Sequence, residues 1–438
     1  MGGAVTGEKD QIDRRLRPQD SQPSETTAPD WSHIIVAFHF DGDCREEDSL
    51  TSKHALSAQQ ILPDDAKTAV LVGRVWSKVA GGPCPVLVRD ERVLDLTAIA
   101  ATVSGLFEIN GIATKLATAT NLPDLGSLDD FLSGTTGHLL APIDLQAIKA
   151  AGVTFADSML ERVIEEQAKG DPSRARSIRE KLAPVLGDSL RGVAAGSEKA
   201  ASIKTLLQDM NLWSQYLEVG IGPDAEIFTK AQPMSSVGCG DKVGIHPISE
   251  WNNPEPEVVL AVRSDGEILG AALGNDVNLR DVEGRSALLL GKAKDNNASC
   301  SVGPFIRLFH DAFTLDVLSK LRVSLLVKGE DGFEMTGQSP MEAISRSPAN
   351  LVSQLRNRNH QYPDGAVLFL GTMFAPVKDR RGVGQGFTHE IGDRVEISTP
   401  LLGRLINWVD RTDACPEWTF GTRALFRNLA ARGLLEKV

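Results

Sequence analysis

The sequence has few cysteines, and none of the five stands in a CxxC pair. Disulfide frameworks and zinc knuckles need paired or clustered cysteines, so we expect reduced, buried thiols. No apolar run reaches the roughly 18 residues that a membrane span needs. The N-terminus also lacks the basic and apolar regions of a secretory signal. These absences predict a cytoplasmic protein without a membrane partner.

Basic residues are in the minority, since 46 Lys and Arg stand against 58 Asp and Glu, a formal charge of −12. Nucleic-acid binders carry a basic surface, so this acidic balance predicts no nucleic-acid partner. Hydrophobic residues make up 42% of the 438 residues, which is ordinary for a globular protein. The length allows about two to three domains, and therefore leaves room for an enzyme.

Common catalytic signatures are missing too. The chain has no GxxxxGK[ST], HExxH or GxSxG motif, and these motifs mark phosphate-binding loops, zinc peptidases and serine hydrolases. The glycines of GVGQG, residues 382–386, do not fit the GxGxxG pattern that opens a helix after a strand.

The chain divides into three regions of different pattern. Residues 1–62 are polar, rich in turn formers and without apolar periodicity, so we expect a disordered extension. Residues 63–145 combine two β-runs with two short helical stretches, which predicts a small α+β domain. Residues 146–438 contain an amphipathic helix over 157–169 and then many short strands. This pattern predicts a mainly β catalytic domain, rolled or barrel-like, and not a parallel βαβ sheet.

One group of acidic residues stands at the end of a predicted hairpin. VVLAVRSDGEILGAALG, residues 258–274, has the Asp-Gly turn that is typical of a hairpin. Glu255 and Glu257 enter its first strand on the same face, because alternate residues of a strand point the same way. Asp276 follows its second strand. Three carboxylates so close repel one another unless a cation holds them, which favours a site for Mg²⁺ or Mn²⁺.

The bare Glu-x-Glu pattern has a second interpretation. It fits a solvated acidic sheet edge, with Pro254 and Pro256 blocking strand pairing, and short motif matches are often accidental. Two nearby features add weight to a functional site. Lys294 can serve as a base near a metal or pair with a substrate carboxylate. Thr372 ends an apolar strand, where a backbone amide and a hydroxyl can hold an anion.

Longer motifs are more specific. NNPEPEVVLAV, GNDVNLRDVEG, GPFIRLF, LFLGT and GDRVEIS occur in this order, and together they resemble the fumarylacetoacetate hydrolase superfamily. GVTFADSMLERVIEE and GRSALLLGKAKDNNAS are similar to its branch of 2-keto-3-deoxy-D-xylonate (D-arabinonate) dehydratases. The likeness runs from about Val72 to Leu435. It implies an α+β fold, namely a mixed β-roll catalytic domain with a smaller N-terminal α+β domain, assembled as a homodimer or higher homo-oligomer.

The resemblance also implies the catalytic centre. Glu255, Glu257 and Asp276 match the ligands of the divalent metal, Mg²⁺ or Mn²⁺. Lys294 matches the active-site lysine of the family. With Glu161, on the helix that caps the site, it is our candidate for moving protons.

Five further residues are implied to bind the substrate. Thr372 matches the threonine at the end of the family's Gly-Thr strand. Lys230, Ser235 and Ser236 stand in TKAQPMSSVG, where relatives line the pocket. Arg162 lies on the capping helix beside Glu161.

One departure from the family bears on the reaction. Its hydrolases activate water with a His on the capping helix, but residues 158–166 contain Glu and Arg and no His. This favours a dehydratase that converts a 2-keto-3-deoxy sugar acid to 2-ketoglutarate semialdehyde in pentose catabolism, with Lys294 or Glu161 removing the C3 proton. Two alternatives stay open. One is a hydrolase of acylpyruvates or 2,4-diketo acids that uses His138 or His360, and the other is a noncatalytic binding protein.

Overall fold

The computed structural model describes residues 55–169, 171, 173–180, 193–209, 213–372, 374, 376 and 378–438, without the side chains of residues 156–158 and 160. The expected disorder of residues 1–54 lies outside the described residues. Ordered chain begins before the predicted boundary at residue 62, because α1 (Ala58–Ile61) packs its isoleucine into the core. From His54 onward the chain forms one compact unit. The domain boundary at residue 145 stays a prediction.

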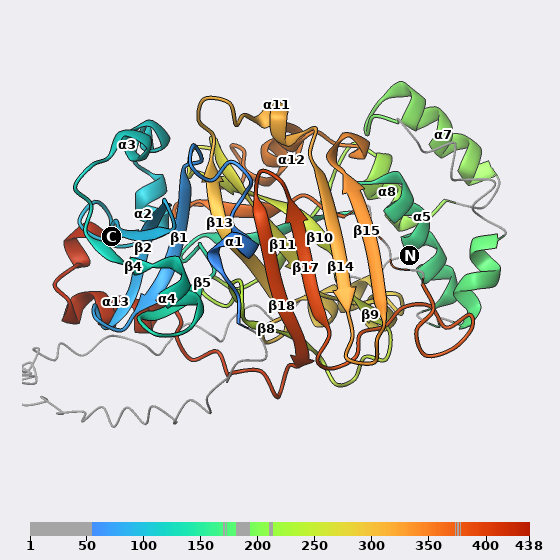
Figure 1. Cartoon of the computed structure of the whole chain (residues 1–438). Coiled ribbons are helices and arrows are strands. Elements are labelled where there is room, and N and C mark those ends of the chain that lie inside the picture. The colour runs from blue at the N-terminus through green and yellow to red at the C-terminus, as the bar shows by residue number, and fades with distance from the viewer. Residues whose placement is uncertain are drawn as a thin grey trace, which may run out of the picture. The chain divides into compact units, whose positions relative to one another are not determined.

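The larger of two main sheets has 11 strands within the described chain (Figure 1). Their order is β4 (Asp124–Ser127), β3 (Arg92–Asp95), β2 (Gly82–Arg89), β1 (Leu71–Ser77), β13 (Cys300–Leu308), β11 (Ile268–Asp276), β10 (Pro256–Val262), β16 (Ala366–Phe369), β6 (Ala147–Gly152) and β7 (Glu226–Ala231), with β5 (Gly137–Leu140) beside β1. β16 and β6 are parallel. Because β1 pairs with β13, strands from both sides of residue 145 share this sheet.

The smaller main sheet lies in front of the larger one in Figure 1. Its order is β15 (Glu334–Pro340), β14 (Arg322–Lys328), β17 (Arg394–Thr399), β18 (Gly403–Arg411) and β8 (Lys242–Ile245). A two-stranded ribbon of β9 (Asn252–Asn253) and β12 (Asn278–Leu279) stands apart from both. Within the described chain both main sheets have free end strands. The predicted α+β fold is therefore a mixed roll and not a barrel.

The β10–β11 hairpin forms as the sequence predicts. Its turn uses Gly266 at a φ of +96°, a left-handed conformation that glycine adopts without a steric penalty. Along β10, Val258 and Leu260 pack into the core between the two main sheets, while Val259 and Ala261 pack into a second core on the other side. Every residue of β10 is buried. The hairpin is therefore held on both faces, so its acidic end is fixed in space.

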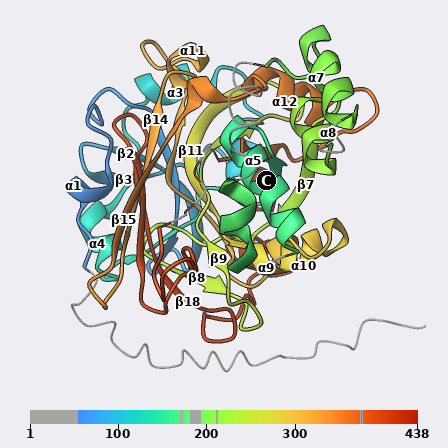
Figure 2. The ribbon, with the colours of Figure 1, turned by 90° about the vertical axis from the view of Figure 1, so that its right-hand side faces the viewer.

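Helices cover both sides of this framework. They are α2 (Val103–Phe107), α3 (Ile112–Thr118), α4 (Leu128–Leu132), α5 (Ala156–Ala168), α7 (Glu198–Asp209), α8 (Gln215–Ile221), α9 (Arg280–Glu283), α10 (Leu290–Lys294), α11 (Leu315–Leu318), α12 (Pro348–Leu355) and α13 (Thr422–Ala431). The helix predicted over 157–169 is α5, and Met159, Val163 and Ile164 form its buried stripe. Figure 2 shows α5 facing the viewer beside β9, α9 and α10. This helix carries two of the predicted site residues.

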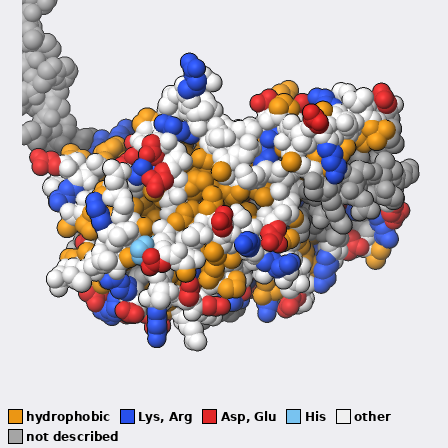
Figure 3. All heavy atoms as spheres, turned by 90° about the horizontal axis from the view of Figure 1, so that it is seen from above, with side chains coloured by type: hydrophobic (Ala, Val, Ile, Leu, Met, Phe, Trp, Pro, Cys, Tyr) orange, Lys and Arg blue, Asp and Glu red, His pale blue; other side chains and the backbone are white. Residues whose placement is uncertain are grey.

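Two features of the described structure bear on membrane and partner binding. In the part of the chain that the structure describes, no helix combines the length and the apolar character needed to cross a membrane. Seen from above, hydrophobic side chains gather in the middle of the molecule between charged ones (Figure 3). The homodimer or higher oligomer stays a prediction.

Candidate active site

The three acidic residues predicted as metal ligands lie together at the end of the β10–β11 hairpin. One carboxylate oxygen from each of Glu255, Glu257 and Asp276 lies within 4.8 Å of the other two. The Asp276 amide donates to the Glu255 carbonyl at 3.1 Å, which ties the two strand ends together. All three side chains are buried. We call these residues the acidic triad.

Two lysines neutralise part of the triad. Lys294, the last residue of α10, places Nζ 2.5 Å from Glu255 Oε2 and 2.9 Å from Asp276 Oδ2. Lys230, from β7, places Nζ 2.9 Å from Asp276 Oδ1. It also donates to the backbone carbonyls of Val277 and Lys294, at 3.2 and 2.5 Å. Lys230 therefore stabilises the Asp276 carboxylate, and its contact with substrate stays a prediction.

Among the described ion pairs, none joins Glu257 to a lysine or arginine, although Lys294 partly offsets the rise in its pKa. Its described hydrogen bond is from the Gly371 amide to Oε2, at 2.6 Å. Burial, Asp276 and Glu255 together raise the pKa of Glu257 well above its usual range. Gly371 has a φ of +89°, and a Cβ there would lie 2.1 Å from Thr154 Oγ1. Glycine is thus required for this backbone amide to approach the carboxylate.

The triad fits a divalent cation. Its donors are hard carboxylate oxygens, the kind that Mg²⁺ and Mn²⁺ prefer. Burial also raises the pKa of Glu255, against the opposing effect of Lys294 and Arg162. Asn253 Oδ1, in the same cavity wall, is buried and has no hydrogen-bond partner in the described structure. A cation with its water ligands would satisfy both the surplus carboxylate charge and such unpaired oxygens.

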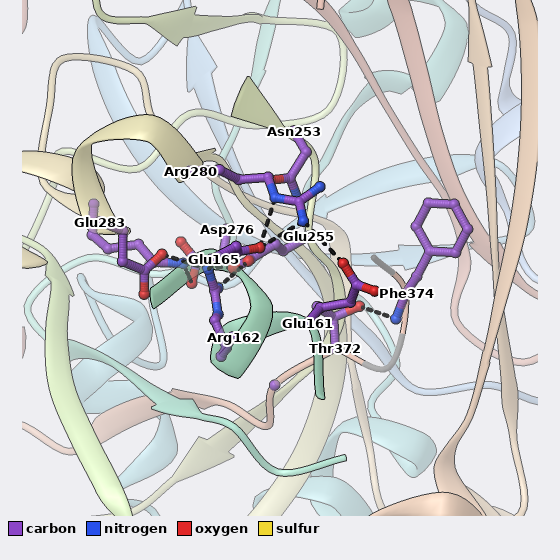
Figure 4. Close-up of polar contacts among 12 residues, drawn as sticks. Glu161, Arg162, Glu165, Asn253, Glu255, Asp276, Arg280, Glu283, Thr372 and Phe374 are labelled. Carbon is purple, nitrogen blue, oxygen red and sulfur yellow. Dashed lines mark hydrogen bonds and ion pairs between the residues drawn. The ribbon is translucent and has the colours of Figure 1, made fainter. Parts of the chain in front are cut away.

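A network of ion pairs connects α5 with α9 and with Glu255 of the triad (Figure 4). Arg162 Nη2 lies 2.6 Å from Glu255 Oε1, while its Nη1 lies 2.8 Å from Glu165 Oε2 and 2.7 Å from Glu283 Oε2. Arg280 is almost fully buried, donates to Glu165 Oε1 at 2.7 Å, and its guanidinium carbon lies 4.3 Å from the Trp251 ring centroid. The network fixes α5 over the hairpin end.

Glu161, predicted to move a proton, is held by two arginines. Arg179 donates to both of its oxygens, at 2.7 and 2.5 Å, and Arg280 reaches Oε2 at 3.3 Å. Lys294, the other candidate, has its pKa raised, because Asp276 and Glu255 outweigh the lowering effect of burial. Charge on the triad thus keeps Lys294 protonated. The roles of both residues stay predictions, although both line the same cavity.

The cavity brings together most of the predicted residues. Its lining includes the triad, Lys294, Glu161, Arg162 and Thr372. Thr372 Oγ1 accepts a hydrogen bond from the Phe374 amide at 3.0 Å. Ser235 and Ser236 do not line this cavity. Their hydroxyls donate to the carbonyls of Gln232 and Cys300, at 2.8 and 3.2 Å, which leaves them as predictions without support from the geometry.

Glu226 is a cavity residue that the sequence reasoning missed. It begins β7 and lies on the same strand face as Phe228, which also lines the cavity. Gly152 lies opposite it, and a Cβ on Gly152 would come within 2.0 Å of Glu226 Oε2. Burial and then Glu283 raise the pKa of Glu226 to about 7. No hydrogen bond or ion pair of Glu226 is described. Strand alternation puts Glu226 on the same face as Phe228, but nothing local in the sequence indicates that this face lines the cavity.

Comparisons with known proteins agree with this geometry. Residues 223–410 match the family described as fumarylacetoacetate (FAA) hydrolase C-terminal. A protein of Haloferax volcanii named probable 2-keto-3-deoxyxylonate dehydratase is 28% identical over 327 residues, 73% of this chain and 93% of that protein. The 2-dehydro-3-deoxy-D-arabinonate dehydratase of Saccharolobus solfataricus is 32% identical over 189 residues, 42% of this chain and 59% of that protein.

Solved structures support the fold. The apo form of 2-keto-3-deoxy-D-arabinonate dehydratase superposes with a TM-score of 0.55 at 21% identity, covering 78% of this chain and 99% of the other. The same enzyme complexed with magnesium and 2,5-dioxopentanoate gives a TM-score of 0.54 with the same coverage. The fold and the relationship predicted from the motifs are both confirmed. Residues 223–410 match the fumarylacetoacetate hydrolase C-terminal family, and the curated relatives that the chain matches are named as dehydratases, as expected of an enzyme.

Proposed function

We propose that this protein is a divalent-metal-dependent dehydratase of 2-keto-3-deoxy sugar acids in pentose catabolism. The observation that carries the proposal is the buried triad Glu255, Glu257 and Asp276, in a cavity that also holds Lys294. Its curated relatives are named for 2-keto-3-deoxyxylonate and 2-dehydro-3-deoxy-D-arabinonate. A solved dehydratase with the same fold holds magnesium and 2,5-dioxopentanoate, which is 2-ketoglutarate semialdehyde.

The triad would hold the cation. When bound, Mg²⁺ or Mn²⁺ supplies Lewis-acid polarisation of the 2-keto acid, which makes the C3 protons more acidic. Lys294 lines the cavity and its Nζ lies 2.5 Å from Glu255 Oε2, so we assign it to stabilising the negative charge that develops on the substrate. Thr372 offers a hydroxyl at the cavity wall.

Proton transfer falls to Glu226 in this proposal. In the metal-free protein the pKa of Glu226 is raised to about 7, mainly by burial, and a carboxyl group with a raised pKa can both take and return a proton near neutral pH. Glu226 removes a C3 proton, and its acid form then protonates the C4 hydroxyl as it leaves. Loss of water leaves a C3–C4 double bond; a proton then moves from C5 to C3, and the resulting C4–C5 enol becomes the aldehyde by moving its hydroxyl proton to C4. Glu161 is less suited because Arg179 and Arg280 occupy both of its oxygens.

The cleavage of acylpyruvates is the second candidate, and the cavity gives it less support. Among the described residues that line the cavity there is no histidine to activate water. His138 stacks on Trp76, with ring centroids 6.5 Å apart, and His360 stacks on Tyr362 at 4.7 Å, both away from the cavity lining. The noncatalytic alternative is set aside, since the curated relatives are named as dehydratases and the chain keeps the triad.

The test incubates purified protein with 2-keto-3-deoxy-D-xylonate or its arabinonate equivalent, with Mg²⁺, with Mn²⁺ or with chelator. We expect 2-ketoglutarate semialdehyde, detected by NMR or by a coupled aldehyde dehydrogenase, only when the metal is present. Acylpyruvate serves as the competing substrate. Cleavage of acylpyruvate without turnover of either sugar acid would refute the dehydratase proposal and support the hydrolase.

A further inference from the structure

We infer that Arg162 competes with the divalent cation for Glu255, and that metal binding thereby frees its guanidinium to bind the anionic substrate. The inference rests on the metal site of the proposed function but not on the dehydration reaction. It also links the metal to the position of the capping helix α5, since Arg162 stands on that helix.

Arg162 is the described connection between α5 and the triad. Its Nη2 donates to Glu255 Oε1 at 2.6 Å. Among the described ion pairs of the other α5 residues, Glu161 contacts Arg179 and Arg280, and Glu165 contacts Arg162 and Arg280. None of these reaches the triad. Among the described ion pairs, the link between α5 and the triad is therefore the one from Arg162 Nη2 to Glu255.

Both oxygens of Glu255 already face cations. Lys294 Nζ lies 2.5 Å from Oε2 and Arg162 lies 2.6 Å from Oε1. A divalent ion bound by Glu255 would stand beside both groups, and like charges at such distances repel strongly in a buried site. One of the two cations must then move away or lose much of its attraction to Glu255.

Arg162 is the group that can move at low cost. Lys294 is tied to two triad carboxylates and its side chain is 2% exposed, whereas the Arg162 side chain is 13% exposed. Nη1 of Arg162 has its own partners, Glu165 and Glu283, at 2.8 and 2.7 Å. The guanidinium can therefore release Glu255 while it stays anchored through Nη1, so no buried charge is left without a partner.

Once released from Glu255, Nη2 of Arg162 can bind the substrate. Arg162 lines the cavity next to the triad, so the N–H groups of Nη2 would face the space that the substrate enters. A guanidinium binds carboxylates with directed, charge-assisted hydrogen bonds. The substrate class that fits is a 2-keto carboxylate, and the cation must bind before Arg162 becomes available to it.

The first experiment measures Mn²⁺ binding to the whole protein without substrate, by calorimetry or electron paramagnetic resonance. Arg162→Gln removes the competing charge, so we expect tighter Mn²⁺ binding, by at least about fivefold. Arg162→Lys keeps a positive charge and should stay closer to the unaltered protein. Arg179→Gln is the matched control, because Arg179 pairs with Glu161 and not with the triad, and its Mn²⁺ affinity should be unchanged.

Unchanged or weaker Mn²⁺ binding by Arg162→Gln, with binding intact in the unaltered protein, would overturn the inference and leave the proposed function standing. Failure of the unaltered protein to bind Mn²⁺ would instead remove the metal site, and with it the proposed function. A second measurement needs no variant. Hydrogen exchange of the α5 amides should become faster when Mg²⁺ is added, because the contact with Glu255 is lost. Slower or unchanged exchange would contradict the inference even if Arg162→Gln does not fold.

Discussion

Substitution of Glu226 by glutamine tests the assignment of the proton-transfer group and has a magnitude that can be worked out. Burial and Glu283 raise the pKa of Glu226 from 4.5 to about 7 in the folded protein. Each pKa unit corresponds to about 1.4 kcal/mol, so the ionised carboxylate lowers the stability of the metal-free fold by about 3 kcal/mol. Glu226→Gln keeps the shape of the side chain and removes this charge.

The sign of the effect depends on pH. The folded state holds the Glu226 proton more tightly than the unfolded state, so the penalty is absent below pH 4.5. It grows as pH rises from 4.5 to 7 and is complete above 7. Glu226→Gln should therefore match the unaltered protein near pH 4.5. At pH 8 it should be more stable, by up to about 3 kcal/mol.

The assay is urea unfolding at several pH values in chelator, followed by the dehydration assay with Mg²⁺. Glu342→Gln, on the exposed surface, is the control and should show no pH-dependent gain in stability. Dehydration by Glu226→Gln should fall by a factor of about 10² or more, the usual contribution of a general acid–base. Equal destabilisation at every pH, or nearly full activity, would refute the reasoning about Glu226.

Three further substitutions probe the rest of the cavity. Glu257→Gln should abolish metal-dependent activity and weaken Mn²⁺ binding while the thermal unfolding stays cooperative; retention of most activity would remove Glu257 from the ligand set. Gly371→Ala should cost about 1–3 kcal/mol and weaken Mn²⁺ binding, because its Cβ would lie 2.1 Å from Thr154 Oγ1 and displace the amide that binds Glu257. Lys294→Met should reduce kcat more than KM, and a change confined to KM would argue against its role in stabilising charge.

The parts of the site that could be predicted from sequence are those built by local structure. The Asp-Gly turn at Gly266 and the alternation around Glu257 were enough to place the acidic residues at one hairpin end. An Asp-Gly turn at Gly332 also joins β14 and β15. In each hairpin the paired residues lie close together in the sequence. The alternation of the strands and the type of turn therefore determine which side chains share a face.

The parts that escaped prediction depend on pairings far apart in the chain. Glu226 faces the cavity because β7 pairs with β6, and Gly152 leaves room for its carboxylate. Lys230, predicted from its motif to bind substrate, places its Nζ 2.9 Å from Asp276 Oδ1, and its contact with substrate stays a prediction. Arg179 neutralises Glu161 from a separate stretch of chain. Local periodicity carries no information about such partners. The roles of Glu161 and Lys230 were therefore predicted without knowing which side chains contact them.

The charge of the cavity connects these observations. Among the described residues that line it, seven are acidic and three are basic, namely Glu161, Glu165, Glu226, Glu255, Glu257, Asp276 and Glu283 against Arg162, Arg280 and Lys294. An anionic keto acid would be repelled by such a surplus of buried carboxylates. A divalent cation at the triad removes two units of this negative charge. The acidic side chains therefore repel an anionic substrate from the metal-free cavity. This repulsion explains the proposed order: the metal binds first, Arg162 is then released from Glu255, and the substrate enters last.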